Sequence, residues 1–282
     1  MPLLRFLYAI WLRFESHDGW AIASHMAMAT LMAIFPFLIF VAALGGVVGP
    51  PGLQSEIVQL LFESWPHAVA APIADEVAKV LGSSRPGLLT ISAILSILLA
   101  SNGVEAVRVG VNRAYGVRET RAFWFSRLQS LFFIIVAAVA LITLAVLVVL
   151  WPVIWSQAVA LVPAIERLAP LISAARYAMT FLILGGAILL IHCYLAAGHR
   201  AFRDILPGTA LTFLLWLAGG AVFSYYLEDF ATYSKTYAGL ASGVAALFFL
   251  WLVAVAFLFG AEFNAVLKES RAASSALMPP PP

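Results

Sequence analysis

Four polar residues recur at helical spacing beside a long apolar stretch, and their side chains are the ones best suited to chemistry. They lie at intervals of four, three and four residues, in the order Ser101, Glu105, Arg108 and Asn112. This spacing places them along one side of a helix, where Glu105 and Arg108 can pair. Ionisable groups beside hydrocarbon face a bundle interior or a wet cavity, because exposing them to lipid is costly. Two interpretations fit the stripe: it is a polar cavity wall open to the cytoplasm, or the Glu105–Arg108 pair only holds helices together near the membrane interface, which its place toward the helix end favours.

Histidine and cysteine offer a second kind of chemistry. His25 lies in the first quarter of an apolar stretch, where it can either relay protons, as a member of the candidate cavity, or hydrogen-bond across a helix interface. His192 and Cys193 are adjacent and therefore point to different faces of a helix, which argues against a shared metal ion. The single cysteine excludes an internal disulfide, and the sequence contains no GxSxG, Walker or HExxH motif. We therefore predict no catalytic, cofactor-binding or metal site, and no enzyme activity.

The elements that position these residues are expected to cross a membrane. Hydrophobic residues make up 63% of the 282-residue chain and charged residues only 11%, whereas roughly a quarter of the residues in soluble proteins are charged. A transmembrane helix needs about 20 apolar residues, and the charge-free intervals of the chain supply six such stretches. We predict an all-α, polytopic membrane helical bundle with six transmembrane helices, at about 20–48, 87–104, 128–151, 177–197, 205–226 and 237–261.

These spans are expected to form a single transmembrane domain over residues 1–268. The apolar pattern of residues 3–14 predicts a short amphipathic helix on the membrane surface, unless it is the frayed start of the first span. Two short amphipathic helices are expected at 50–86, between the first and second spans, either covering the outer mouth of the bundle or lying at the interface. The Pro-rich tail 269–282 is expected to be disordered.

The basic residues predict the orientation of the bundle. Eleven of the 16 Lys and Arg residues fall on the same predicted side as both termini, and five of them lie within 108–127, whereas the 14 acidic residues divide evenly. Because Lys and Arg are retained on the cytoplasmic side, we expect both termini in the cytoplasm. A net charge of +2 without a basic run argues against a nucleic-acid partner.

Seven more residues are expected to shape or join the helices. A proline inside the first span should kink it, and a Pro-Gly pair opens the fifth span, where proline suits a first helical turn. Two glycines four residues apart open the sixth span and permit close helix approach. An acidic residue and an asparagine at its inner end either contact the Arg-rich segment or lie at a solvated helix end. In chain order these residues are Pro36, Pro207, Gly208, Gly239, Gly243, Glu262 and Asn264.

Several segments together resemble the YihY/BrkB family of bacterial inner-membrane proteins. They are NRAYGVRETRAFW (112–124), LPG (206–208), Tyr237 with Gly239, GAEFNA (260–265) and the Phe35-Pro36 pair of the first span. The resemblance covers nearly the whole chain, from about Asp18 to Lys268, with the motifs in the right order. It implies a six-span protein of the bacterial inner (cytoplasmic) membrane with a role in the cell envelope. Members of the family have carried ribonuclease BN and virulence-factor labels.

Two functions from different classes fit the sequence. The first is transport or export of a lipid or small solute across the envelope. The alternative is a non-transporting scaffold or envelope assembly factor, whose basic segment 108–127 binds a cytoplasmic partner. Ribonuclease activity on tRNA is disfavoured, because the chain has no H-x-H-x-D cluster that could hold a metal pair. The expected partners are the lipid bilayer and a lipid or small-solute substrate, without a cofactor; the oligomeric state does not follow from the sequence.

Overall fold

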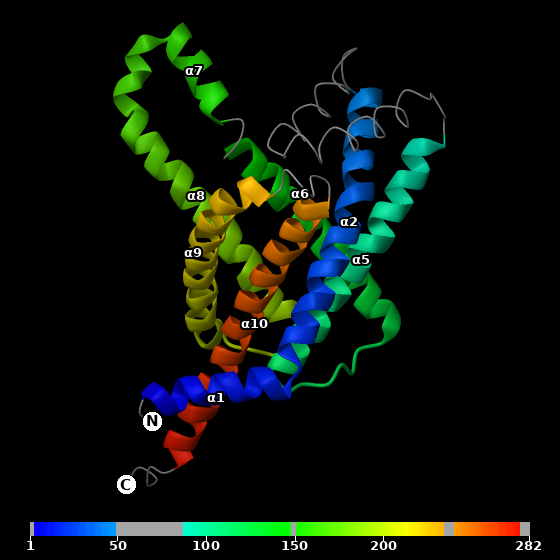
Figure 1. The fold of residues 1–282 in the computed structure, drawn as a ribbon, viewed down its shortest axis with the longest axis vertical. Coiled ribbons are helices and arrows are strands. Elements are labelled where there is room, and N and C mark those ends of the chain that lie inside the picture. The colour runs from blue at the N-terminus through cyan, green and yellow to red at the C-terminus, as the bar shows by residue number, and fades with distance from the viewer. Residues whose placement is uncertain (1–2, 49–86, 148–150, 234–239, 277–282) are drawn as a thin grey trace.

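The computed structural model describes residues 3–48, 87–147, 151–233 and 240–276, and every regular element within those ranges is helical. The elements are α1 (Leu3–Ser16), α2 (Gly19–Val48), α5 (Leu88–Ala114), α6 (Phe123–Ala145), α7 (Trp151–Leu161), η2 (Pro163–Leu168), α8 (Ala169–Leu190), η3 (Ile191–Leu195), α9 (Phe202–Tyr233) and α10 (Leu240–Ala276). In Figure 1, α5, α2, α10 and α9 stand next to one another, α1 lies across one end, and α7 leans away at the other. The helices predicted at 50–86 lie outside the described residues.

The described helices have the lengths and compositions of membrane spans. Five stretches are long and apolar enough to cross a bilayer, namely Ala93–Ala114, Phe123–Ala140, Pro163–Leu195, Phe202–Tyr226 and Gly243–Arg271. The α2 helix adds a shorter apolar stretch over Gly19–Ile34. Large apolar side chains such as Ile135 and Val222 are exposed on the outer faces of these helices, as a lipid-facing surface requires. The predicted all-α, polytopic membrane bundle is therefore confirmed, with room for six spans.

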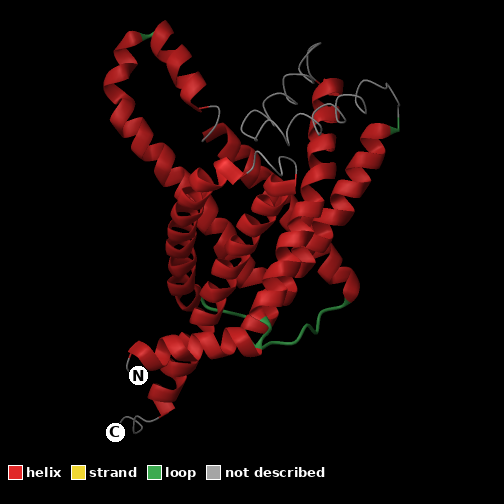
Figure 2. Ribbon diagram, viewed as in Figure 1, coloured by secondary structure: helices red, strands yellow, loops and turns green. Residues whose placement is uncertain are grey.

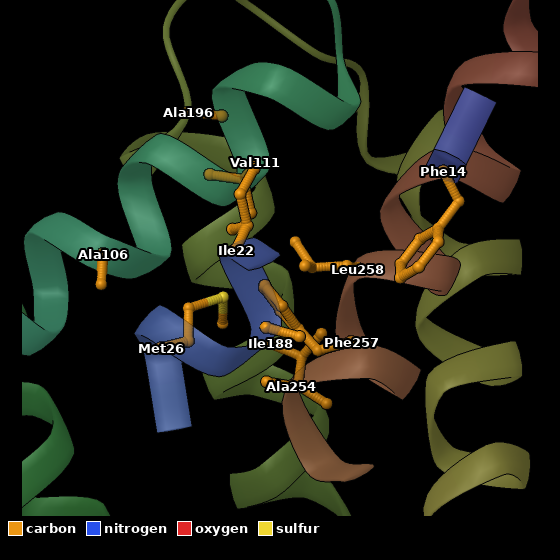
Figure 3. Close-up of a cluster of buried hydrophobic side chains, with 11 residues drawn as sticks. Phe14, Ile22, Met26, Ala106, Val111, Ile188, Ala196, Ala254, Phe257 and Leu258 are labelled. Carbon is orange, nitrogen blue, oxygen red and sulfur yellow. The ribbon is translucent and has the colours of Figure 1, made fainter. Parts of the chain in front are cut away.

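The best-packed part of the bundle lies where α2, α5 and α10 meet (Figure 3). Met26 of α2 packs in one buried cluster with Val111 of α5 and Leu258 of α10. Phe14 of α1 joins the cluster, and its ring stacks on that of Phe259 with centroids 4.2 Å apart. These contacts fix three spans and the N-terminal helix relative to one another, and so provide the frame for the polar residues described below.

The N-terminal helix α1 has the amphipathic character that its sequence predicts. Its buried side chains, Ile10 and Phe14, face the bundle, and in Figure 2 the helix crosses the last turns of α10. On its other sides Leu4, Tyr8 and Trp11 are exposed. A helix that presents apolar side chains both inward and outward suits the boundary between bundle and lipid. Its position on the membrane surface stays a prediction.

The second span ends later than the sequence indicates. The α5 helix continues to Ala114, past the expected end near 104. Its last turns carry Arg108 and Asn112, beyond the span predicted to end near 104, and both side chains are buried. Helix α6 supplies hydrogen-bond partners to Arg108, and the loops at 115–122 and 196–201 supply those of Asn112, so the helix continues without exposing these groups to lipid.

The fifth and sixth spans also differ from their predicted boundaries. The α9 helix begins at Phe202, so Pro207 lies inside it rather than in its first turn. The α10 helix continues to Ala276, so residues 269–276 are helical and not a disordered tail. An ion pair between Glu269 and Arg13, 2.6 Å from Oε1 to Nη1, ties this extension to α1. Likewise, α6 begins at Phe123 and α8 at Ala169, both earlier than expected.

Candidate functional site

Polar contacts concentrate at one end of the bundle. We call it the basic end: it carries α1, the two loops at 115–122 and 196–201, and the last described turns of α10 (Figure 2). Eleven of the chain's 16 Lys and Arg residues belong to the segments that meet at this end. Their contacts form three groups, which are described in turn.

The first group is centred on Arg108, whose side chain is fully buried. Its Nη1 pairs with Glu105 one turn earlier on α5. Its Nη2 donates to the Ser126 carbonyl at 2.7 Å and to the Ser130 hydroxyl at 2.9 Å, both on α6. A charged group can be buried beside hydrocarbon only when it is paired and hydrogen-bonded in this way. We call this line of contacts between α5 and α6 the Arg108 seam.

Two further residues extend the Arg108 seam along α5. Nearer the middle of the helix, Arg127 of α6 donates to the Ser101 hydroxyl at 2.8 Å. Toward the basic end, the Asn112 amide donates to Glu119 at 3.1 Å and accepts from the backbone N–H of Ala197 at 2.7 Å. Asn112 therefore joins the 115–122 loop to the 196–201 loop.

The second group is built on Arg121 of the 115–122 loop. Its guanidinium binds Glu119, 2.6 Å from Nη2 to Oε2, and donates to the Leu195 carbonyl at 2.7 Å. The Gln129 side-chain oxygen accepts another of its bonds at 2.9 Å. The hydrogen bonds from Arg121, followed by that from Asn112, hold the pKa of Glu119 down at about 2. The loop is therefore fastened to the C-terminal end of η3 by charge-assisted hydrogen bonds.

The third group runs from α5 through η3 to α10. The Tyr115 hydroxyl lies 3.0 Å from Nδ1 of His192, which is fully buried, and accepts from the Asn264 amide at 3.3 Å. The Arg200 guanidinium lies over the Tyr115 ring, 3.9 Å from its centroid. Burial raises the pKa of Tyr115 to about 12, so this hydroxyl stays protonated and can donate to an acceptor nitrogen of His192.

Asn264 also joins α10 to α9 where the two backbones touch. Its Oδ1 accepts from the Gly208 N–H at 2.7 Å, and its Nδ2 donates to the Ile205 carbonyl at 3.0 Å. A Cβ added at Gly208 would lie 2.0 Å from the Gly260 carbonyl oxygen. Only glycine permits this approach. The amide side chain thus satisfies backbone groups next to Pro207, which itself has no N–H to donate.

Glu262 lies two residues before Asn264 on α10 and completes the contacts of the basic end. It accepts from Nε of Arg13 at 3.0 Å, and its other oxygen lies 2.5 Å from Nδ1 of His17. Arg13 also donates to the Ala114 carbonyl at the end of α5, 3.2 Å away. Glu262 therefore contacts Arg13 of α1 and the His17 imidazole in the turn after it, rather than the Arg-rich segment after α5 or open solvent.

An apolar pocket of about 320 Å³ lies beside the Arg108 seam. Its walls come from α2, α5, α6 and α8 with η3, and its α5 wall consists of Ala100, Gly103, Val104 and Val107. Ala137 of α6 also lines it and is exposed, so the pocket is open at its side. The polar stripe and the pocket therefore occupy neighbouring faces of α5, one filled by protein contacts and one open.

Comparison with known proteins assigns the family. The sequence pattern of the virulence factor BrkB family matches residues 10–281. The chain belongs to this family. YfkH of Bacillus subtilis, a protein named as ribonuclease-like, is 27% identical over 271 residues, which are 95% of this chain and 97% of YfkH. A UPF0761 membrane protein of Rhodospirillum centenum is 27% identical over 264 residues, 92% of this chain and 56% of that protein. One from Chromohalobacter salexigens is 25% identical over 287 residues, 96% of this chain and 65% of that protein. No solved structure matches.

The fold of this BrkB-family chain brings together only some of the residues that were predicted to line a polar cavity. Ser101, Arg108 and Asn112 are buried along the Arg108 seam, and Glu105 is half-exposed at its edge. His25 is exposed on α2, outside the seam. Whether these residues act on a substrate stays a prediction.

Of the seven residues predicted to shape or join the helices, some make the expected contacts and others do not. Gly208, Glu262 and Asn264 take part in helix contacts. Gly243 is exposed, and a Cβ added there would meet nothing within 4 Å. Its predicted partner Gly239 lies outside the described residues, and α2 is helical through Pro36.

Several residues that make contacts between the helices of this BrkB-family bundle were not predicted from the sequence. Tyr115 and Gly260 stood within quoted motifs, yet nothing local named their partners on distant helices. Ser126 and Ser130 carried a usable signal, because two serines four residues apart near the start of an apolar helix mark one polar face. Among the residues that the structure describes, no group of three His, Cys, Asp or Glu side chains is arranged to hold a metal ion.

Proposed function

We propose that this BrkB-family protein moves a lipid or similar amphiphile across the bacterial inner membrane. The observation that supports the proposal is the apolar pocket of about 320 Å³ between α2, α5, α6 and α8, beside the buried Arg108. Ligand sites combine apolar walls with a few placed polar groups. Intramembrane ionisable residues that face a bundle interior mark substrate pathways in many transporters. An amphiphile has both kinds of surface, and it reaches the pocket from the bilayer itself.

The orientation belongs to the same proposal. The basic end carries eleven of the 16 cations, which favours its placement in the cytoplasm with both termini. The pocket then lies above the cytoplasmic interface, within reach of the inner leaflet. A reporter fused within the 115–122 loop should report a cytoplasmic location. A periplasmic location would instead place the pocket within reach of the outer leaflet.

Reconstitution into liposomes tests the transport step. The purified full-length protein should speed the passage of a fluorescent phospholipid between leaflets, measured as the fraction that an external reductant can quench. Ala100→Phe, which places a ring in the pocket, should slow passage at least about tenfold, a barrier change of roughly 1.4 kcal/mol. Leu98→Phe is the matched control, because Leu98 is exposed on α5 and does not line the pocket. Passage no faster than in protein-free liposomes would refute the proposed function.

A scaffold role is the second candidate. It is favoured by the filled Arg108 seam and by Arg118, which is exposed on the 115–122 loop and free to meet a cytoplasmic partner. Deleting residues 50–86 separates the two functions, since a cytoplasmic scaffold should tolerate that loss and a transporter should not. YfkH is named as ribonuclease-like, but the sequence of this chain lacks the H-x-H-x-D cluster that would hold a metal pair, which disfavours ribonuclease activity. Metal-dependent RNA cleavage by the purified protein would contradict this expectation.

A further inference from the structure

The walls of the apolar pocket lead into polar groups on their side nearest the basic end. On α5, Val104 lines the pocket, and Arg108 follows one turn later, where the pocket face borders the polar face. On α6, Ile134 lines it, and Ser130, one turn earlier, accepts a hydrogen bond from Arg108 at 2.9 Å. On the third wall Leu195 lines the pocket, and its carbonyl accepts from Arg121 at 2.7 Å. The polar and cationic groups of the basic end therefore lie one helical turn beyond the apolar walls, or hydrogen-bond to their backbone, on this side of the pocket.

The charges at that end are predominantly positive. Arg108, Arg121 and Arg127 face two carboxylates, those of Glu105 and Glu119. Arg108 is fully buried, and its Nε has no hydrogen-bond partner in the part of the chain that the structure describes. A buried donor without an acceptor is costly and uncommon. The Nε–H of Arg108 is therefore one donor of the seam that the described protein groups leave unused.

Arg127 gives an incoming headgroup a route to the seam. Its side chain is half-buried, and it bonds to Ser101, the neighbour of the pocket-lining Ala100. Its guanidinium also lies 5.3 Å from the ring centroid of Phe123, an exposed aromatic residue at the start of α6. Aromatic and basic side chains at the end of a span are typical of the headgroup level of a bilayer.

We propose that the pocket binds an anionic phospholipid, with an acyl chain between α2, α5, α6 and α8 and the phosphate held by Arg127 and Arg108. This inference rests on the proposed function and names its substrate class. The apolar walls select a hydrocarbon chain, which a free anion lacks, and the net positive charge of the seam selects an anionic headgroup over a zwitterionic one. Basic pockets between transmembrane helices bind anionic headgroups by the same physics.

Native mass spectrometry of the purified full-length chain tests the site. Phosphatidylglycerol and phosphatidylcholine with identical chains are added together at equal concentration, and the protein should retain phosphatidylglycerol about tenfold more often, a difference of roughly 1.4 kcal/mol. Ala138→Phe, which fills the pocket from α6, should lose both lipids. Val139→Phe is its control, because Val139 is 59% exposed and does not line the pocket. Arg127→Gln should still bind lipid but with the preference reduced to about twofold, and Arg127→Lys should recover most of it.

Three outcomes would overturn the proposal. The first is equal retention of the two lipids by the wild-type protein. The second is equal lipid binding by Ala138→Phe and Val139→Phe. The third is binding of inorganic phosphate by a protein that retains neither lipid, which would make the seam a free-anion site. Phosphatidylglycerol preference without lipid movement in liposomes would refute transport and leave this site standing, whereas movement without preference would do the reverse.

Discussion

Two neighbouring faces of α5 differ in how they are covered: protein contacts close the polar face, whereas the apolar face borders an open pocket. The polar face, from Ser101 to Asn112, is closed by hydrogen bonds from α6 and the two loops of the basic end. The apolar face, from Ala100 to Val107, borders an open space of about 320 Å³. Charged and amide groups in a bilayer must find protein partners, whereas apolar side chains lose little by facing lipid instead of protein. Stability should therefore come mainly from the basic end, and room for a ligand from the apolar face.

The largest expected loss of stability comes from separating α9 and α10 where their backbones touch. Gly208→Ala places a methyl group 2.0 Å from the Gly260 carbonyl oxygen. Because two backbones must then move apart, we expect a loss of about 4 kcal/mol or more in the free energy of unfolding, or no folded protein. Gly243→Ala is the control, since its methyl group meets nothing within 4 Å. Thermal unfolding in detergent and the folded yield measure both; equal behaviour of the two variants would contradict the contact.

Removing Arg108, the centre of the seam, should cause the second-largest loss of stability. Arg108→Ala leaves the Ser126 carbonyl and the Ser130 hydroxyl without their charged donor, at a cost of about 3 kcal/mol. The cost is not larger because the side chain of Glu105, the carboxylate left behind, is 41% exposed and can be hydrated. Arg118→Ala removes an exposed arginine and should change stability by less than about 0.5 kcal/mol. Denaturant unfolding followed by tryptophan fluorescence measures the difference.

A single amide tests how far the basic end depends on backbone capping. Asn264→Leu keeps a similar volume but removes the side-chain acceptor of the Gly208 N–H and one of the donors to the Ile205 carbonyl, which should cost about 2 kcal/mol. Asn102→Leu is the matched control, because Asn102 is exposed on α5. Hydrogen exchange should increase at Gly208 in the first variant only. Unchanged protection there would show that the amide is not needed to cap this turn.

The smallest expected effect is a pH dependence in the 115–122 loop. The pKa of Glu119 is lowered from 4.5 to about 2, so its contribution is present above pH 4.5 and is lost as the pH falls toward 2. Its side chain is 28% exposed, and solvent screening reduces the effect to about 1 kcal/mol. Wild-type protein should lose more stability than Glu119→Gln between pH 5 and pH 3. Parallel unfolding temperatures for the two proteins would count against the ion pair with Arg121.

The sequence predicted the apolar elements of this comparison better than the polar ones. Charge-free intervals are a property of each segment alone, so the helices could be placed without knowing their neighbours. The spacing of Ser101 to Asn112 predicted that the helix continues past the apolar span, but not which groups meet its polar side chains, because Ser126 and Ser130 lie on α6. The contact of Gly208 with Gly260 joins residues of different helices, and neither glycine has a local pattern that names the other. The pocket arises from four helices at once and has no signature in any of them.

The wide turn of η3 has a consequence for how the basic end is assembled. A π-helical segment carries one residue more per turn than an α-helix can hold, and it leaves carbonyls free of their usual partners. Because the helix also ends at Leu195, the carbonyls of Tyr194 and Leu195 have no following turn to bond to, and Gln129 and Arg121 donate to them instead. Deleting one residue between Ile191 and Leu195 would let this turn relax into a regular helix. The chain beyond it would then rotate by about 100°, a single α-helical step. The Tyr194 and Leu195 carbonyls at the end of the fourth span would then turn away from Gln129 and Arg121, and the fourth span would lose its connection to the loop after the second.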